Sequence, residues 1–596
     1  MTTVKTLGAA ALIAAAMWQG ETSALAQQAG ALRPGEVRDG AAAARVDEYL
    51  SRLVRHGFSG AVLIAAVPPG GNWATEGRVV LKRAYGMADR AAGRPYTVDM
   101  VSTIGSITKQ FTGAAIMKLE MMGKLKTTDA ISKYLPGVPA DKAGITIHHL
   151  LTHTAGFPGD MGGADDDAIE RDALVARVLA APLAHAPGGQ FEYSNEGYSL
   201  AGAIIERVSG QGYEAFLREH LFLASGMNDT GYQAKPWAPE KLPVGYTPEG
   251  EPWGRVHKRG WLADGPGWYL RANGGIHSTL DDMYRWHLAL ESTAVLSADA
   301  RDKYQKGSAP ALGGTEHYAY GWGVRTSRRG GKVISHNGGN MVFGADVRRY
   351  VDEGVVIIAM SNQPVIPATQ LAPRQIESLY FGDQDVVMPP APIDVPRAHR
   401  DALSGTYTTA GGGTFVVRAT DEGLEAQASD PSTFSASGRI TAPGGRFADV
   451  EARTMPIIEA AVKGNMRPMF DARKFEDGRT LESFEAVHRK TWETWQGKYG
   501  AFQRLELLGT SIVEQGDPAV TVRLLFERGG PVMQYVWGPR RLFAVREAPS
   551  PFVKLEAESP DTWVYYSYRQ PRLVRVRFGA GGVEIDGLGG PLTARK

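Results

Sequence analysis

The chain has 596 residues, more than one hydrophobic core usually supports, and we therefore expect two or three domains. The 65 Lys and Arg residues balance the 64 Asp and Glu residues, which gives no electrostatic footprint for nucleic acid. The sequence has no cysteine, and this excludes disulfides, a lipid-modified cysteine anchor and thiolate metal sites.

The first residues have the pattern of a secretory signal peptide. Lys5 precedes an apolar stretch from Leu7 to Trp18, and Ala24-Leu25-Ala26 has the small residues of a cleavage site. The apolar stretch is too short to cross a bilayer, and an uncleaved anchor is the alternative. We therefore expect removal of residues 1–26, a flexible lead-in over 27–40, and a periplasmic or secreted bacterial protein whose mature form has no membrane span.

The region from 41 to 385 has a block of helices between two groups of strands. Apolar residues at helical spacing predict a helix over 42–54, and the strand-like runs 60–64 and 79–81 suggest an antiparallel sheet with a helix on one face. Residues 106–123 are apolar on several sides, which predicts a buried helix. Strands return at 320–324, 332–334 and 355–359. This order predicts a sheet lobe split by an inserted helical lobe.

Residues 386–397 contain four prolines and form the predicted linker. Beyond the linker, short strands separated by glycine turns predict a β-rich accessory region over 398–596, made of one or two domains. A helix-like stretch, 457–470, interrupts these strands. The predicted strands of this region include 405–407, 414–417, 520–525 and 573–576.

Ser106-Ile107-Thr108-Lys109 is the first motif that could carry chemistry. On a helix, residues three apart share one face, so the serine hydroxyl and the lysine amine can touch. A serine hydroxyl is a weak nucleophile until a neighbouring base takes its proton. Taken alone, the motif also fits a helix-capping serine followed by a lysine whose stem packs on the surface.

Two further motifs contain residues suited to the same chemistry. In Tyr193-Ser194-Asn195, a desolvated phenol beside a lysine could ionise, although a loop tyrosine packing on the core is the simpler reading. In His336-Asn337-Gly338-Gly339, the glycines allow a backbone N–H to approach a substrate carbonyl. The same Asn-Gly pair is also the strongest local signal for a hairpin turn after the strand 332–335.

In this order, the three motifs resemble the active-site elements of the serine β-lactamase and penicillin-binding-protein superfamily. Those elements are Ser-x-x-Lys, Tyr-x-Asn and Lys/His-x-Gly. The segments Leu150–Gly156 and Gly274–Thr279 are similar to the family as well. The nearest branch contains class C β-lactamases, DD-carboxypeptidases, D-aminopeptidases and esterases. The resemblance implies an α/β (α+β) fold. In this fold, the antiparallel sheet lobe is DD-peptidase/β-lactamase-like and a helical lobe is inserted into it. A β-rich C-terminal region follows.

The resemblance also implies roles for individual residues. Ser106 would be the acylated nucleophile and Lys109 would accept its proton. Tyr193 would pass that proton to the leaving group and later activate water, while Asn195 would orient Lys109 and the substrate. The backbone N–H groups of Ser106 and Gly339 would form the oxyanion hole. Lys109 and Tyr193 both remain possible bases for acylation. Two coupled groups titrate as a pair, so the sequence does not assign the proton to one of them.

The third motif departs from the commonest family version, Lys-Thr-Gly. His336 places a titratable imidazole where a fixed charge usually stands, and Asn337 replaces a hydroxyl with an amide. We expect His336, Asn337 and Gly338 to bind substrate, and we expect hydrolysis of a small ester or amide, as in an esterase or a D-amino-acid amidase or peptidase. A β-lactamase or DD-carboxypeptidase is the alternative. The expected partner is a small-molecule or peptide substrate.

Two other functional classes fit parts of the sequence. His149 and His153 are four residues apart, as in zinc proteases, but Leu150 occupies the position where those enzymes need glutamate. We therefore expect neither a metal nor another cofactor. The other class is a non-catalytic penicillin-recognising sensor, which would not need Ser106, Lys109 and Tyr193 together.

Overall fold

The computed structural model describes most of the chain beyond the predicted signal peptide. The described residues are 32–159, 161–233, 236–248, 250–311, 315–383, 386–391, 393–409, 413–421, 423–429, 433, 443–473, 480–512, 517–527, 530–538, 541–547, 552–568, 573–587 and 590–596. The predicted signal peptide 1–26 and the first part of the predicted lead-in lie outside them. Among the described residues, helices that combine the length and the apolar character needed to span a membrane are absent.

The chain divides into two compact units, Met1–Val386 and Val387–Lys596. The division falls at the start of the predicted proline-rich linker. Each unit has its own hydrophobic clusters, and each is described by itself below.

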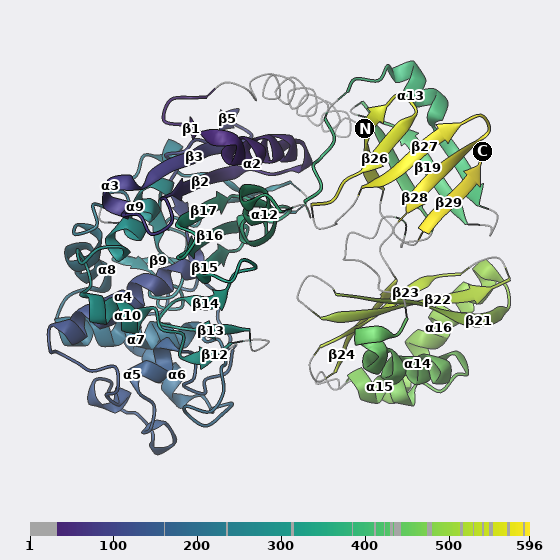
Figure 1. The fold of residues 1–596 in the computed structure, drawn as a ribbon. Coiled ribbons are helices and arrows are strands. Elements are labelled where there is room, and N and C mark those ends of the chain that lie inside the picture. Colours follow the sequence, from purple (N-terminus) through teal and green to yellow (C-terminus); the bar gives the residue numbers. More distant parts are fainter. Residues whose placement is uncertain are drawn as a thin grey trace, which may run out of the picture. The chain divides into compact units, whose positions relative to one another are not determined.

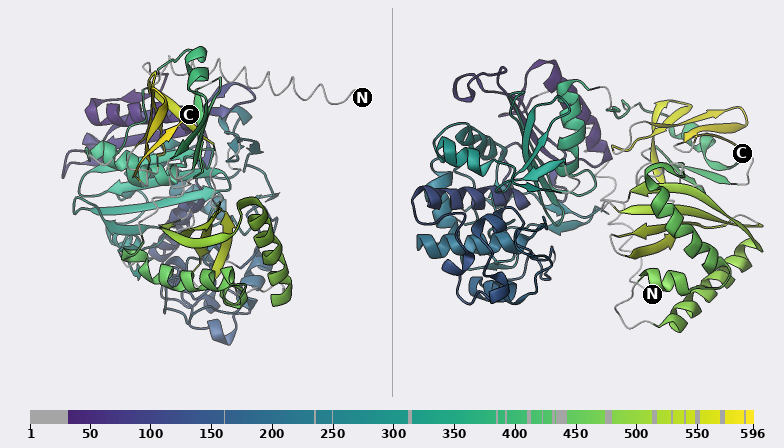
Figure 2. Two further views of the ribbon diagram at one scale, coloured as in Figure 1. Left: turned by 90° about the vertical axis from the view of Figure 1, so that its right-hand side faces the viewer. Right: turned by 60° about the horizontal axis from the view of Figure 1, so that its bottom comes forward.

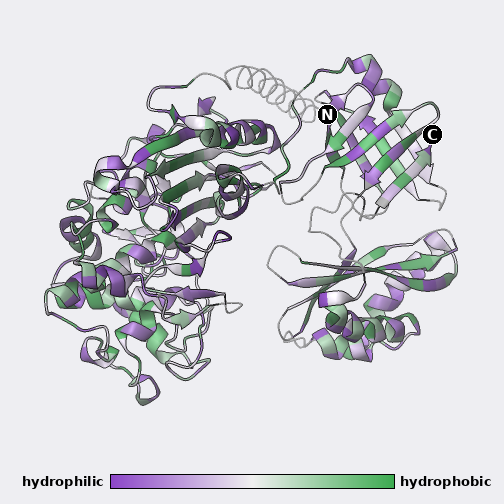
Figure 3. Cartoon of the chain, viewed as in Figure 1, coloured by the Kyte–Doolittle hydropathy of each residue, from purple (hydrophilic) through white to green (hydrophobic). Residues whose placement is uncertain are grey.

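A nine-stranded antiparallel sheet forms the frame of the first unit (Figure 1). Its strands, in spatial order, are β1 (Val37–Arg38), β3 (Arg78–Tyr85), β2 (Gly60–Ala66), β17 (Val355–Ser361), β16 (Phe343–Tyr350), β15 (Lys332–Asn340), β14 (Gly323–Thr326), β13 (Glu316–Tyr318) and β12 (Ala309–Pro310). All residues of β16 and β17 are buried, and Figure 3 shows β2 and β17 as largely hydrophobic. Strands without alternation are typical of a sheet that is covered on both faces.

Helices cover both faces of this sheet, whereas the sequence predicted a helix on one face. The helices α2 (Gly40–Leu53) and α12 (Glu377–Phe381) pack against each other, and α2 also packs on β3. The helix α9 (Leu280–Leu290) packs on β2 and β17. The side chains of Ala61, Leu63 and Ala65 join the core shared with the helical lobe. The fully apolar strand 60–64 was the available signal for the second layer, because a strand without a polar face is covered on both sides.

The inserted lobe surrounds one buried helix, α4 (Thr108–Met121). A 3-10 turn, Gly105–Ile107, precedes α4, so the predicted helix 106–123 is confirmed apart from its first turn. The short strands β6 (Ser102–Thr103) and β11 (His277–Ser278) pair beside this turn. Further helices of the unit are α3 (Trp73–Glu76), α5 (Ile147–Leu151), α6 (Arg171–Ala180), α7 (Asn195–Ser209), α8 (Tyr213–Leu217), α10 (Ala298–Tyr304) and α11 (Ala368–Leu371). Short strand pairs are β4 (Met87–Asp89) with β5 (Arg94–Pro95), β7 (Gly245–Tyr246) with β8 (Pro252–Gly254), and β9 (Trp261–Leu262) with β10 (Gly265–Pro266).

The strand β15 is longer than the sequence predicted. It continues through Asn337 and Gly338 to Asn340, and the connection to β16 follows at Met341, which has a φ of 53°. Asn337 pairs with Asp346 of β16. The hairpin-turn reading of Asn337-Gly338 is therefore wrong, because pairing along the whole of β16 overrides the local turn preference of Asn-Gly.

The second unit contains a closed antiparallel barrel and a separate sheet with helices. The helix α13 (Arg397–Leu403) precedes the barrel. The barrel strands, in order, are β18 (Gly405–Thr409), β19 (Thr414–Ala419), β20 (Leu424–Ala428), β25 (Val553–Ser559), β26 (Thr562–Tyr565), β27 (Val574–Gly579), β28 (Gly582–Gly587) and β29 (Gly590–Arg595). Between β20 and β25, the chain forms a four-stranded sheet of β21 (Phe502–Ile512), β22 (Pro518–Phe526), β23 (Val532–Trp537) and β24 (Leu542–Glu547).

Three helices pack on one face of this four-stranded sheet (Figure 2). They are α14 (Ala448–Val462), α15 (Arg467–Arg473) and α16 (Leu481–Tyr499). The predicted helical stretch 457–470 is thus two helices, separated at Gly464, whose φ is 85°. The sequence interpretation missed α16, although its aromatic residues recur at helical spacing.

Candidate active site

The segment that carries Ser106 is buried except at that residue. The backbone leaves β6 through the 3-10 turn and enters α4 directly. Within residues 101–117, all of which the structure describes, Ser106 alone is not buried. Gly105 has a φ of 52°, in the left-handed region that favours glycine. The turn therefore presents the Ser106 hydroxyl at the N-terminal end of a buried helix.

Lys109 lies one turn further along and reaches back to Ser106. Its side chain is fully buried. Lys109 Nζ lies 3.1 Å from Ser106 Oγ, and it donates hydrogen bonds to Asn195 Oδ1 at 2.8 Å and to the backbone carbonyl of Asn273 at 3.0 Å. The amine is therefore held between two fixed acceptors and the serine hydroxyl.

Tyr193 and Asn195 approach Lys109 from the start of α7. Ser194, between them, points the other way, and its hydroxyl caps the helix by accepting a backbone hydrogen bond at 3.2 Å. Lys109 Nζ lies 4.8 Å from the centre of the Tyr193 ring, and the Ser106 side chain acts on the pKa of Tyr193. The structure thus brings together Ser106, Lys109, Tyr193 and Asn195, as the sequence predicted.

Burial moves the pKa values of the lysine and the tyrosine in ways that favour their uncharged forms. It lowers the pKa of Lys109 to about 7, although the carboxylates of Asp165 and Glu196 act in the opposite direction. Burial raises the pKa of Tyr193, and the Ser106 side chain offsets only part of that shift. Near neutral pH, a sizeable fraction of Lys109 is therefore a neutral amine, whereas Tyr193 is a phenol.

The backbone of β15 lies directly against the 3-10 turn. A Cβ atom added to Gly338 would lie 2.0 Å from the carbonyl oxygen of Ile104 and 2.6 Å from the amide nitrogen of Ser106. A Cβ atom on Gly105 would lie 2.4 Å from the amide nitrogen of Gly339. This approach requires glycine at both positions and places the amides of Ser106 and Gly339 beside each other. Gly339 is exposed, so a substrate can reach it.

His336 is held as a neutral imidazole. Its Nδ1 contacts the backbone carbonyl of Asn337, which can only accept, so Nδ1 carries the proton. Its Nε2 therefore accepts a hydrogen bond from the Tyr318 hydroxyl at 2.7 Å. Burial and the nearby Lys109 lower the pKa of His336 to about 4. The third motif thus provides no positive charge near neutral pH.

His153 supports Tyr193, a role that the sequence did not reveal. The two rings lie 4.2 Å apart, and His153 Nδ1 accepts a hydrogen bond from the amide of Ser194 at 3.1 Å. His149 lies elsewhere in the packing, where its Nδ1 accepts a backbone hydrogen bond from Thr146. Among the described residues, groups of three or more His, Cys, Asp or Glu side chains arranged to hold a metal are absent.

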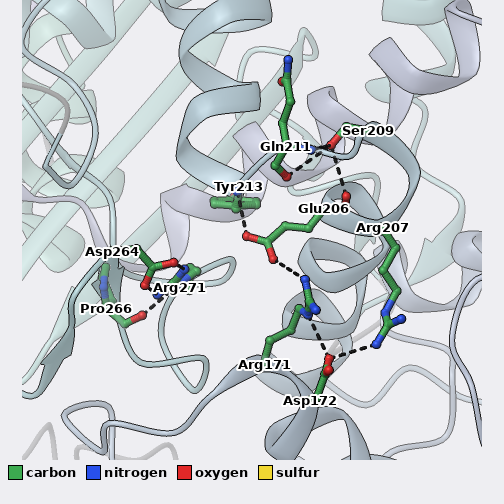
Figure 4. A network of polar contacts seen from close by, with 10 residues as sticks. All are labelled: Arg171, Asp172, Glu206, Arg207, Ser209, Gln211, Tyr213, Asp264, Pro266 and Arg271. Carbon is green, nitrogen blue, oxygen red and sulfur yellow. Dashed lines mark hydrogen bonds and ion pairs between the residues drawn. The ribbon is translucent and has the colours of Figure 1, made fainter.

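The loop that supplies the Asn273 carbonyl is fastened by a buried arginine. Arg271 donates two hydrogen bonds of 2.6 Å to Asp264 and one of 2.9 Å to the Pro266 carbonyl (Figure 4). In the same view, Glu206 accepts hydrogen bonds of 2.8 Å from Arg171 and from the backbone of Tyr213, tying the end of α7 to α6 and α8. The Arg271 contacts hold the loop whose Asn273 carbonyl accepts a hydrogen bond from Lys109. The sequence could have revealed Asn273 as a site residue, because it directly precedes the family-like segment Gly274–Thr279. No such feature of the sequence pointed to Tyr318.

Comparison with known proteins settles the family. A family model described as Beta-lactamase matches residues 72–380, just over half of the chain. The chain belongs to the Beta-lactamase family. Its family resemblance and fold class are therefore confirmed, and it is a hydrolase of the serine β-lactamase fold. The matched residues lie within the first unit and include all eight predicted site residues.

Several known proteins with different names are similar to the chain. Penicillin-binding protein 4* of Bacillus subtilis is 28% identical over 381 residues, which cover 60% of this chain and 78% of that protein. Esterase EstB of Burkholderia gladioli is 31% identical over 230 residues, covering 35% of this chain and 56% of the esterase, less than two thirds of its length. The octameric penicillin-binding protein homologue from Pyrococcus abyssi has a TM-score of 0.52 at 17% identity, covering 92% of this chain and 99% of that chain, and shows the fold alone.

Proposed function

We propose that this Beta-lactamase-family protein hydrolyses a small ester or amide through an acyl-enzyme on Ser106. The observation that carries the proposal is the convergence of three sequence-distant segments on one hydroxyl. Lys109 Nζ lies 3.1 Å from Ser106 Oγ, and the Ser106 side chain also acts on the pKa of Tyr193. An activated nucleophile needs a base within such a distance.

Lys109 is the base for acylation in this proposal. In its neutral form it keeps two N–H bonds for Asn195 Oδ1 and the Asn273 carbonyl, and its lone pair is left for the Ser106 hydroxyl. The raised pKa of Tyr193 makes a phenolate base unfavourable. The sequence left both residues open as the base, and the opposite pKa shifts favour the lysine.

The proposed reaction proceeds through a tetrahedral intermediate. Ser106 Oγ attacks the substrate carbonyl carbon as its proton moves to Lys109. The amides of Ser106 and Gly339 stabilise the oxyanion. Tyr193 gives its proton to the leaving alcohol or amine and regains one from Lys109, as the bond to the leaving group breaks. Water then attacks the acyl-enzyme with the same groups acting in reverse, which releases the acid.

The neutral imidazole of His336 supports an ester or amide substrate that lacks a carboxylate next to the scissile bond. A fixed cation would bind such a carboxylate, but the pKa of His336, about 4, keeps this position uncharged at neutral pH. The similarity to esterase EstB agrees with an ester substrate. A β-lactamase or DD-carboxypeptidase is the second candidate, because the similarity to penicillin-binding protein 4* covers more of both chains.

A panel of substrates tests the proposal. We expect p-nitrophenyl acetate and D-alanine p-nitroanilide to be turned over faster than nitrocefin, relative to their uncatalysed rates. A fluorophosphonate probe should add its mass to the wild-type protein and none to Ser106→Ala. Faster turnover of nitrocefin would reassign the protein as a β-lactamase. A folded protein that neither labels nor turns over any substrate would instead be a binding protein.

A further inference from the structure

We propose that the second unit contains a binding site for a neutral aromatic small molecule that carries one hydroxyl group. The site is a cavity of about 720 Å³ between the helices α14, α15 and α16 and the strands β22, β23 and β24. Pockets of this size commonly hold small ligands, with mostly apolar walls and a few polar groups. This site is separate from the proposed active site, since all its lining residues lie beyond Val387.

Aromatic and sulfur-containing side chains form a large part of the wall, seven of its twenty lining residues. The aromatic residues are Phe484, Trp492, Trp495 and Tyr535, and the methionines are Met466, Met469 and Met533. Trp492 and Trp495 are only partly buried, although they belong to the apolar cluster of this sheet and its helices. Flat rings and flexible thioethers pack well against another ring. The cavity therefore suits a ligand with an aromatic ring.

Tyr535 supplies a polar group inside this apolar cavity. The residue is 4% exposed, and within the described chain its hydroxyl makes no hydrogen bond. Burial raises the pKa of Tyr535, so the hydroxyl stays protonated. The hydroxyl oxygen is not among the buried side-chain atoms without a partner, so it faces the open cavity, where a ligand oxygen could take the place of water. Tyr535 therefore offers a ligand hydroxyl a hydrogen-bond partner within the cavity.

The remaining polar residues favour a ligand without charge. His488 Nδ1 donates a hydrogen bond of 2.9 Å to the Phe484 carbonyl, which leaves Nε2 as an acceptor. Burial lowers the pKa of His488, with Arg473 adding to the effect, so the ring is neutral near pH 7. Arg473 and Arg489 line the cavity together with Glu485, so both signs of charge are present. A ligand hydroxyl can accept from one such group and donate to another.

The first test asks whether a neutral probe occupies this cavity. N-phenyl-1-naphthylamine, which fluoresces in apolar surroundings, should bind the full-length protein saturably with one site per chain. Ala461→Phe adds a ring inside the cavity wall on α14, and we expect probe affinity to fall by about tenfold or more. Ala452→Phe is the matched control, because Ala452 lies exposed on the same helix outside the cavity. It should bind as the wild type does. Near-UV circular dichroism checks that all variants are folded.

The second test uses the hydroxyl of Tyr535. 2-Naphthol and naphthalene should both displace the probe. Tyr535→Phe should weaken the binding of 2-naphthol roughly fivefold, because one hydrogen bond is lost. The same substitution should leave the binding of naphthalene unchanged. Equal probe affinity in Ala461→Phe and the wild type would overturn the proposal. So would the absence of saturable binding, or loss of the probe when a fluorophosphonate phosphonylates Ser106 with release of fluoride, which would place the probe in the active site.

Discussion

At the residue scale, burial determines which form of each group is available around Ser106. Lys109 is enclosed and loses its charge at a much lower pH than an ordinary lysine, since burial lowers its pKa from 10.5 to about 7. Burial raises the pKa of Tyr193 instead, so its hydroxyl stays protonated. The same desolvation thus makes one neighbour a usable base and the other a proton donor.

The rate of acylation should follow the titration of Lys109. The neutral amine is the reactive form, so the rate should rise with pH, by about tenfold between pH 6 and pH 8, with a midpoint near 7. The burst of p-nitrophenol from p-nitrophenyl acetate measures this rate, after subtraction of the Ser106→Ala background. His336→Gln should leave the midpoint in place, because the pKa of His336 is about 4. A rate that is flat from pH 5 to pH 9 would contradict Lys109 as the base.

Replacing His336 with lysine should change substrate preference. His336→Lys introduces a fixed positive charge at the third motif. We expect the ratio of kcat/KM for nitrocefin to kcat/KM for p-nitrophenyl acetate to rise about tenfold. A rise of this size corresponds to the free energy of one hydrogen bond to a charged group. The control His336→Gln removes the imidazole without adding charge and should leave the ratio near the wild-type value. An unchanged ratio in His336→Lys would mean that this position does not contact the substrate carboxylate.

At the element scale, the site depends on the contact between the 3-10 turn and β15. The two backbones approach so closely that side chains cannot fit between them, at Gly105 on one side and Gly338 on the other. Beyond Ser335, β15 no longer pairs with β14, which leaves an open strand edge toward the turn. The open edge allows backbone N–H groups to serve a substrate instead of a neighbouring strand.

Two alanine substitutions one residue apart should have very different effects. In Gly338→Ala, the new methyl group would lie 2.0 Å from the Ile104 carbonyl, so the turn must shift. We expect kcat/KM for p-nitrophenyl acetate to fall about a hundredfold, because small displacements of catalytic groups have effects of that size. In Gly339→Ala, the nearest atom is the Phe343 carbonyl at 3.2 Å, and we expect a loss well below tenfold. Equal losses would show that the close approach is unimportant.

At the scale of the whole molecule, the proposed catalytic groups and their contacts belong to one unit. Ser106, Lys109, Tyr193, His336 and Gly339 all precede Val386, and the family model ends at residue 380. The barrel of the second unit and its inserted sheet have separate apolar clusters. The chain therefore combines a hydrolase unit with a unit whose proposed role is ligand binding.

Truncation after Val386 should leave the basal chemistry intact. We expect the shortened protein to hydrolyse p-nitrophenyl acetate with a kcat within about threefold of the full chain, because its catalytic contacts and core remain. The same truncation carrying Ser106→Ala serves as the blank. If a folded truncated protein loses activity by more than about a hundredfold, the second unit must contribute to the reaction.

The sequence by itself determined the local parts of this protein. Ser106 and Lys109 are three residues apart, on the 3-10 turn and the first turn of α4, and the order of strands and helices predicted the lobes. Both depend on short-range spacing, which the chain carries wherever it folds. The three motifs together also identified the family, although each of them alone allowed a simpler reading.

Only the tertiary structure decided which of those readings holds. Asn337-Gly338 forms strand rather than turn because it pairs with β16. Tyr318, His153 and the Asn273 carbonyl reach the site from distant segments, and the shift in the pKa of Lys109 comes from the groups packed around it. The cavity of the second unit likewise exists only after three helices pack on one sheet. Such contacts depend on long-range packing and desolvation, which have no periodic trace along a single chain.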